Sequence, residues 1–146
     1  LHTNDSTSSL SRLMDMGIES FLISSTLLGV LAQRLSRKLC PHCKREDVLP
    51  VHIAEEIGVP KDKLFSHAVG CKECDYTGYR GRQAIGELFI IDDETKSMMK
   101  DGANDFQIRD AMKKRGMVTL SDKLKRMLLE GETSYEEALR IGLMDG

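Results

Sequence analysis

Two Cys-x-x-Cys pairs constrain this chain more than any other feature. The first pair is Cys40-Pro41-His42-Cys43, the second is Cys71-Lys72-Glu73-Cys74, and the sequence contains no other cysteine. Two such pairs in one short segment have the spacing of a tetrathiolate metal site, because each tight turn directs two sulfurs toward one point. Four sulfurs around one ion form a tetrahedron, which Zn2+ accepts readily. The spacing therefore predicts a zinc site made by Cys40, Cys43, Cys71 and Cys74.

A thiol-disulfide redox site and a pair of structural disulfides are the alternatives. Cys-Pro-His-Cys is the dithiol of DsbA-type oxidoreductases, where it opens a helix that lowers the thiol pKa. Here the motif follows a segment with a long helical pattern, and a second Cys-x-x-Cys would be surplus. A disulfide across two intervening residues closes too short a loop to stabilise much. We therefore favour a metal site and keep the redox protein as an alternative. His42, inside the first turn, could replace a thiolate as ligand, although such a residue is more often an exposed loop side chain.

The charge distribution bears on the choice of partner. The net charge of −2 gives no general case for binding nucleic acid or an anionic membrane. Basic residues nevertheless flank both cysteine pairs, where they either offset the thiolate charge or bind a phosphate or an acidic partner. These residues are Arg34, Arg37, Lys38, Lys44, Arg45, Lys72, Arg80 and Arg82. A nucleic-acid-binding zinc ribbon that stacks bases on Tyr76 and Tyr79 is a second alternative.

The apolar pattern argues against a membrane span. The most apolar stretch, residues 21–32, is interrupted by Ser24, Ser25 and Thr26, and a span needs about twenty apolar residues. We recognise no signal peptide, so reduced cysteines indicate the cytosol. The chain begins with Leu1 rather than Met, which we interpret as a piece of a longer protein.

Periodicity and capping signals predict an α+β fold that is mostly helical. We expect helices over 5–16, 19–38 and 51–57, the second being apolar enough to lie deep in a larger core. A strand is expected over 64–69, and another over 79–91 that is covered on both faces. A bundle of four helices is expected over 92–146. Their predicted starts are Asp92, the capping box Asn104/Gln107, Thr119, and the capping box Thr133/Glu136.

Several short motifs together resemble the secretion ATPases of the type II secretion and type IV pilus assembly family. They run from residue 1 to about residue 91, and the helical tail matches only in general character. The motifs are Leu1-His2-Thr3-Asn4-Asp5, Arg12-Leu13-Met14-Asp15-Met16-Gly17, the segment 28–35 ending Gln33-Arg34-Leu35, the four cysteines, Thr77-Gly78-Tyr79-Arg80-Gly81-Arg82, and Ile85-Gly86-Glu87-Leu88. The four cysteines point to the assembly or secretion branch, since the retraction ATPases of this superfamily lack them.

The resemblance implies a fold, cofactors and partners that the residues alone do not. Family members are hexameric, bind ATP and Mg2+ on a RecA-like core, and act on an inner-membrane platform at the cytoplasmic face of the bacterial inner membrane. By this resemblance, His2 belongs to the family's His box beside the γ-phosphate. Arg80 and Arg82 would contact nucleotide or a neighbouring subunit, unless they only offset the thiolates.

The same resemblance divides the chain into four segments. Residues 1–39 would be the C-terminal helices of the RecA-like domain and residues 40–78 the zinc module. Residues 79–91 would return as a strand to the ATPase core, and residues 92–146 would form a C-terminal helical subdomain.

One departure from the family limits the activity we expect. The phosphate-binding loop Gly-x-x-x-x-Gly-Lys-Ser/Thr occurs nowhere in the chain, so we expect that the chain by itself does not hydrolyse ATP. Four protein ligands leave no open metal position, so the zinc is expected to be structural. We also expect that Cys71→Ser unfolds residues 40–78 and leaves the C-terminal helices mostly intact.

Overall fold

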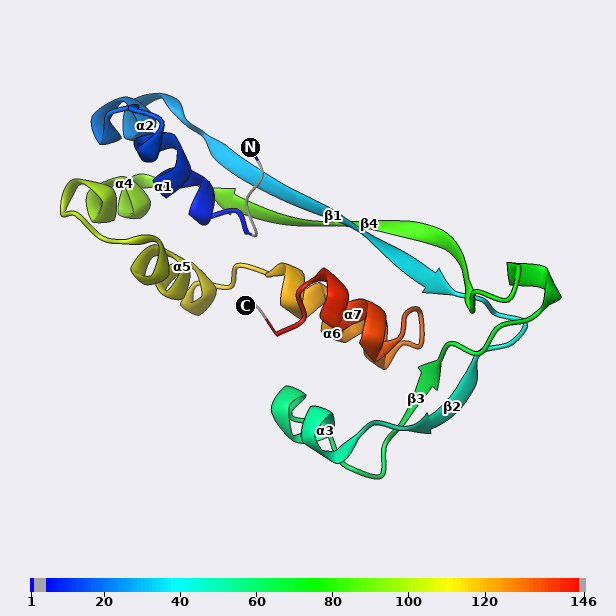
Figure 1. The fold of residues 1–146 in the computed structure, drawn as a ribbon. Coiled ribbons are helices and arrows are strands. Elements are labelled where there is room, and N and C mark those ends of the chain that lie inside the picture. The colour runs from blue at the N-terminus through cyan, green and yellow to red at the C-terminus, as the bar shows by residue number, and fades with distance from the viewer. Residues whose placement is uncertain (2–4, 145–146) are drawn as a thin grey trace. The chain divides into compact units, whose positions relative to one another are not determined.

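The computed structural model describes residues 1 and 5–144, which divide into two compact units. The first unit comprises residues 1–33 and 86–119, and the second comprises residues 34–85 and 120–146. Strands β1 (Gly29–Leu39) and β4 (Tyr79–Ile90) pair in a two-stranded sheet, and each contributes residues to both units (Figure 1). The described chain is therefore a mixed α/β protein with more helix than strand, in agreement with the predicted class.

The first unit packs four helices around the end of β4. These helices are α1 (Ser8–Asp15), α2 (Ser20–Thr26), α4 (Asp93–Lys100) and α5 (Asp105–Lys114). Phe89 is fully buried at the centre of this core. It is surrounded by Leu10, Ile23, Ile91, Met99, Ile108 and Met112. The methionines therefore serve here as filler between helices, a role that suits their flexible side chains.

The second unit combines a small β-ribbon with three helices. Strands β2 (Arg45–Val48) and β3 (Leu64–His67) pair antiparallel, with Arg45 opposite His67 and Val48 opposite Leu64. Helix α3 (Val51–Ile57) connects them, and α6 (Leu120–Leu129) and α7 (Tyr135–Ile141) complete the unit. Its buried apolar side chains include Leu49, Ile53, Phe65, Leu124, Leu128 and Ile141.

Three of the predicted helix starts are confirmed by side-chain hydrogen bonds. The Asp5 carboxylate accepts a hydrogen bond from the Ser8 amide at 2.8 Å at the start of α1. Asp92 caps α4 by accepting from the Thr95 amide. The capping box of α5 has both reciprocal bonds, between Asn104 and Gln107, each at 2.9 Å. These starts were predictable because the caps are local in sequence.

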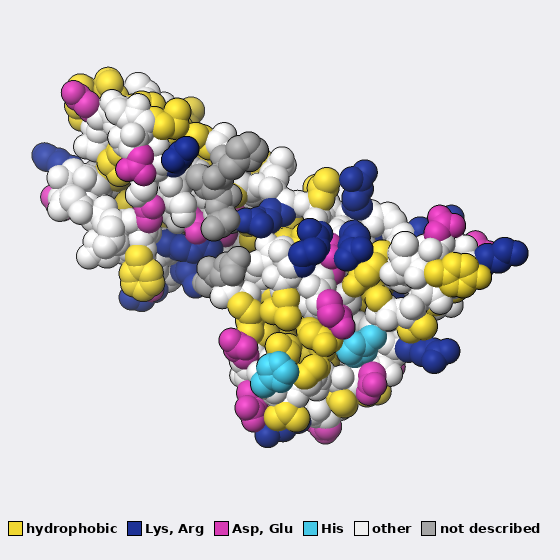
Figure 2. All heavy atoms as spheres, in the orientation of Figure 1, with side chains coloured by type: hydrophobic (Ala, Val, Ile, Leu, Met, Phe, Trp, Pro, Cys, Tyr) yellow, Lys and Arg dark blue, Asp and Glu magenta, His cyan; other side chains and the backbone are white. Residues whose placement is uncertain are grey.

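The predicted helix over 19–38 is wrong beyond residue 26. Helix α2 ends at Thr26, whose hydroxyl turns back to the Leu22 carbonyl, and Leu27 is extended. From Gly29 onward, burial follows the alternation of a strand rather than a helical period. Nor is the segment deep in a core here, since Phe21 and Leu28 are 61% and 82% exposed. Hydrophobic side chains lie at the surface in the region of α2 (Figure 2).

Strand β4 was predicted correctly, but it is not covered on both faces. Ile85, Glu87 and Phe89 are buried, whereas the alternating Leu88 and Ile90 are about half exposed. In the described residues, β4 pairs only with β1. The near-continuous apolar run therefore has one buried face in this chain.

Two further differences concern the last helices. The cap of α7 is Ser134, which accepts from the Glu137 amide at 3.2 Å, so the predicted box Thr133/Glu136 is one position early. The helices of 92–146 also divide between the two units, α4 and α5 in the first and α6 and α7 in the second. Among the described residues, no helix has the length and apolar character needed to cross a membrane.

Candidate metal centre

The four cysteines come together as the spacing predicts. Their Sγ atoms all lie within 4.8 Å of one another, and all four thiols are free of disulfides. The pairs Cys40–Cys71, Cys43–Cys74 and Cys71–Cys74 are each separated by 3.9 Å. Four sulfurs about 2.3 Å from a central Zn2+ would form a tetrahedron with edges of about 3.8 Å. The donor set therefore fits a tetrathiolate zinc ion in both chemistry and spacing.

Tight turns hold the second cysteine pair in place. Cys71 precedes a short 3-10 helix, Lys72–Cys74, and the chain then passes through two left-handed residues, Asp75 and Tyr76. Gly70, with φ +116°, approaches this turn so closely that a Cβ would lie 2.7 Å from the Tyr76 carbonyl oxygen. Only glycine fits there without strain, because it tolerates positive φ and lacks a Cβ.

Backbone amides supply further stabilisation for thiolates. Gly70 donates to Cys43 Sγ at 3.3 Å, and Cys71 and Gly78 each donate to Cys74 Sγ at 3.2 Å. Although burial raises the pKa of Cys74, the hydrogen bonds from Cys71 and Gly78 dominate and lower it to about 6. Burial raises the pKa of the neighbouring Cys71 to about 11. A divalent ion would remove this imbalance, because metal binding requires all four thiolates.

The surroundings of the first pair bear on the redox alternative. Cys40 follows strand β1, so the helical pattern we used against a redox site is wrong. However, residues 41–43 form a turn that leads into β2, and no helix opens at Cys43. We therefore prefer a metal site to a redox site because all four sulfurs lie close together. His42 is exposed and is not a member of the described cluster.

The remaining predicted site residues are not part of the four-cysteine cluster. His2 lies outside the described residues. Arg80 is exposed and lies 3.9 Å from Glu73, and Arg82 is also exposed. Lys44 donates to the Gly131 carbonyl at 3.0 Å. Arg80 and Lys44 therefore each have a polar partner within the chain.

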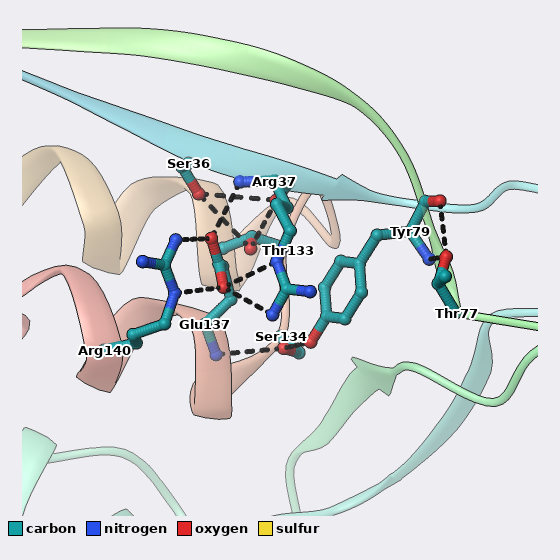
Figure 3. A network of polar contacts seen from close by, with 8 residues as sticks. All are labelled: Ser36, Arg37, Thr77, Tyr79, Thr133, Ser134, Glu137 and Arg140. Carbon is teal, nitrogen blue, oxygen red and sulfur yellow. Dashed lines mark hydrogen bonds and ion pairs between the residues drawn. The ribbon is translucent and has the colours of Figure 1, made fainter. Parts of the chain in front are cut away.

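Sequence reasoning missed a polar network around a buried carboxylate, beside the candidate metal centre (Figure 3). The Glu137 carboxylate is fully buried and accepts from the Arg37 amide at 2.9 Å, from Arg37 Nε at 3.0 Å, and from Arg140 Nε at 2.9 Å. The Arg37 guanidinium lies 4.1 Å above the Tyr79 ring, and the Tyr79 hydroxyl lies 2.5 Å from Ser134 Oγ. We call Arg37, Tyr79, Ser134, Glu137 and Arg140 the Glu137 clamp.

The clamp also determines the charge state of its acid. Burial alone would raise the pKa of Glu137, but the hydrogen bonds from Arg140 and Arg37 lower it to about 2. Because Arg37 covers a face of Tyr79, that ring is less available to stack on a base. Tyr76, the other tyrosine of the zinc-ribbon alternative, is 74% exposed.

A second buried acid organises the first unit. Glu87 is fully buried and receives Arg109 Nη1 and Nη2 at 2.6 and 3.0 Å. Its Oε1 also accepts from the Ser6 amide and hydroxyl at 3.1 and 2.7 Å. Glu87 thereby connects the segment before α1 to β4 and α5.

Comparison with known proteins now places the chain in a family. The sequence model of the family described as "Type II/IV secretion system protein" matches residues 1–140. The chain belongs to this family.

Its relatives include both secretion and pilus proteins. The chain is 43% identical to the type II secretion system protein HxcR of Pseudomonas aeruginosa, over 97% of this chain and 27% of that protein. It is also 43% identical to the type IV pilus assembly ATPase TfpB of Acinetobacter baylyi, over 97% of this chain and 25% of that protein. The type IV pilus assembly ATPase PilB of Thermus thermophilus is 38% identical to the chain, over 95% of this chain and 16% of that protein. The chain thus spans about a quarter of the length of the first two relatives.

Proposed function

We propose that this chain is the C-terminal part of a hexameric ATPase that powers type II protein secretion or type IV pilus assembly. The family match supports the class, and relatives named for both processes agree with either role. The observation that carries the proposal for this part of the protein is the convergence of four cysteine sulfurs at tetrahedral spacing.

In this proposal the metal is structural. Zn2+, when bound, supplies cross-linking of two chain segments rather than chemistry, because four protein ligands leave no position for water or substrate. Cys40 and Cys43 hold the end of β1, and Cys71 and Cys74 hold the turn before β4. Residues 40–78 would then be a rigid surface for docking to an inner-membrane platform from the cytoplasmic side.

The catalytic part of the proposal rests on the intact protein. ATP and Mg2+ would bind a RecA-like core with His2 near the γ-phosphate and Arg80 and Arg82 at a subunit or nucleotide contact. The chain lacks the phosphate-binding loop, whose amides and lysine neutralise charge in phosphoryl transfer. It should therefore be inactive alone.

Steady-state ATP hydrolysis tests this assignment. The full-length protein should hydrolyse ATP, and the 146-residue chain should not. His2→Ala in the full-length protein should lower kcat by about 100-fold or more, the loss expected when a transition-state contact is removed. His52, which is exposed on α3, provides the matched control, since His52→Ala should leave kcat unchanged. Equal rates for both histidine variants would refute the role of His2.

A pull-down tests the docking surface. Full-length protein should retain the cytoplasmic domain of the platform when zinc is bound, and should lose it after treatment with a chelator. Retention that does not depend on the chelator would exclude the zinc module as the docking surface.

A further inference from the structure

The two strand ends at the metal centre are bonded to each other. The Cys40 amide donates to the Gly78 carbonyl at 2.9 Å, and the Gly78 amide donates to Cys74 Sγ at 3.2 Å. Cys40 is the residue after β1, and Gly78 is the residue before β4. The positions of Cys40 and Cys74 therefore determine where the neighbouring residues of both strands lie.

The loop before α7 is bonded to these same strand ends. The Leu39 amide donates to the Glu132 carbonyl at 2.9 Å, and Thr133 Oγ1 donates to the Arg37 carbonyl at 2.9 Å. Tyr79, the residue next to Gly78, reaches Ser134 through its hydroxyl. In each of these hydrogen bonds, one partner is a residue within three positions of Cys40 or Gly78.

The buried acid makes this contact sensitive to small displacements. Glu137 is fully buried, and it accepts from both the amide and the side chain of Arg37. If β1 moved, the Glu137 carboxylate would lose its hydrogen bonds from Arg37. A buried charge that is incompletely paired lowers the stability of the fold. Helix α7 can therefore dock fully only when the end of β1 is in the position seen here.

We propose that metal binding at the four cysteines and docking of α7 stabilise each other through the Glu137 clamp. The inference rests on the proposed zinc centre and concerns positioning residues, since Glu137 acts on the ligands only through β1 and β4. Linkage is reciprocal, so loss of the metal loosens α7, and loss of the clamp weakens the metal. Helix α7 thus belongs to the metal-dependent part of the chain, whereas the sequence-based expectation was that the C-terminal helices remain mostly intact.

Zinc affinity of the 146-residue chain tests one direction of the coupling. Competition with a chromophoric zinc chelator should show about tenfold weaker binding for Glu137→Gln, as for residues that orient metal ligands. Glu55→Gln is the matched control, because Glu55 forms an exposed ion pair with Lys61 in the same unit. Its zinc affinity should equal that of the unchanged chain.

Hydrogen exchange tests the other direction. Chelation should speed amide exchange across residues 135–141 and leave residues 93–114 of the first unit unchanged. If Glu137→Gln fails to fold, Tyr79→Phe decides, because it removes only the hydroxyl bond to Ser134. It should weaken zinc binding about twofold to fivefold, the effect of one hydrogen bond of about 0.5–1 kcal/mol.

The outcomes separate the inference from the metal assignment. If the unchanged chain binds no zinc, the proposed metal centre itself is refuted. A different result overturns only the coupling. In that case the unchanged chain binds zinc, the clamp variants that fold bind it with the same affinity, and chelation does not change the amide exchange of α7.

Discussion

Two buried carboxylates, Glu87 and Glu137, are the polar centres of the two units. Each is fully buried and each receives a guanidinium at hydrogen-bond distance, from Arg109 and from Arg37 and Arg140 respectively. Such charge-assisted pairs are geometrically selective, and removal of one partner leaves an uncompensated charge. These residues therefore specify which strand meets which helix, in addition to any net stability they contribute.

Removal of Glu87 should destabilise the first unit. Glu87→Ala leaves Arg109, whose side chain is 13% exposed, without its main acceptor, and should lower the free energy of unfolding by about 3 kcal/mol. Urea denaturation followed by circular dichroism measures this change. Asp110→Asn, which breaks an exposed pair with Lys114, should cost less than about 0.5 kcal/mol. Equal effects of the two variants would contradict the central position of Glu87.

The pH dependence of the first unit should reflect Asp92. Hydrogen bonds from Arg115 and from the Thr95 amide hold the pKa of Asp92 well below its ordinary value of 3.8. A carboxylate with a lowered pKa contributes stability that is fully present above pH 3.8 and is lost as the pH falls below it. Asp92→Asn, which keeps the helix cap, should therefore flatten the fall in stability below pH 3.8. A parallel decline in both proteins, measured by urea unfolding between pH 5 and pH 2, would argue against this role.

At the scale of elements, local capping chemistry marks the starts of four helices, α1, α4, α5 and α7. Asp5, Asp92, Asn104 and Ser134 each accept a backbone amide three residues later. Because caps satisfy otherwise unpaired amides of the first turn, short helices such as α4 and α5 can start at defined positions.

The box of α5 provides a test at this scale. Asn104→Ala should destabilise the first unit by about 1 kcal/mol, since the side-chain oxygen that accepts from the Gln107 amide is lost, while the backbone amide of residue 104 can still donate to Gln107. Asn104→Asp keeps a side-chain oxygen as acceptor and should lower the free energy of unfolding by only a few tenths of a kcal/mol. Thermal unfolding compares the two variants. If Asn104→Asp were less stable than Asn104→Ala, the capping argument would be contradicted.

The sequence predicted elements whose signals are local and missed those that depend on partners. Helix 51–57 and strand 79–91 have their turn residues and periodicity within a few positions. The stretch after Thr26 is apolar on successive residues, so a helical and a strand period fit it equally, and pairing with β4 decides for the strand. The four-cysteine site was predictable because its spacing alone carries the geometry. The Glu137 clamp was not, because Arg37 and Glu137 are 100 positions apart.

At the scale of the whole molecule, the candidate metal centre belongs to one unit only. All four cysteines, the Glu137 clamp, α6 and α7 lie in the second unit, whereas α1, α2, α4 and α5 lie in the first. A structural zinc supplies roughly 10–16 kcal/mol of apparent binding free energy. The fold of the second unit should therefore depend on the metal far more than that of the first.

Limited proteolysis tests this division. In Cys71→Ser, cleavage should spread over residues 34–85 and 120–144, while α4 and α5 keep their resistance. Mass spectrometry of the fragments locates the cuts. Ser97→Ala, an exposed change in the first unit, should leave the pattern as it is. Unchanged resistance across the second unit of Cys71→Ser would show that the metal does not organise it.

Elemental analysis of the chain purified under reducing conditions tests the central claim most directly. One zinc ion per chain is predicted, with all four thiols titratable once the metal has been removed. A preparation in which no ion is bound, or in which the cysteine sulfurs are oxidised to one another, would contradict the account.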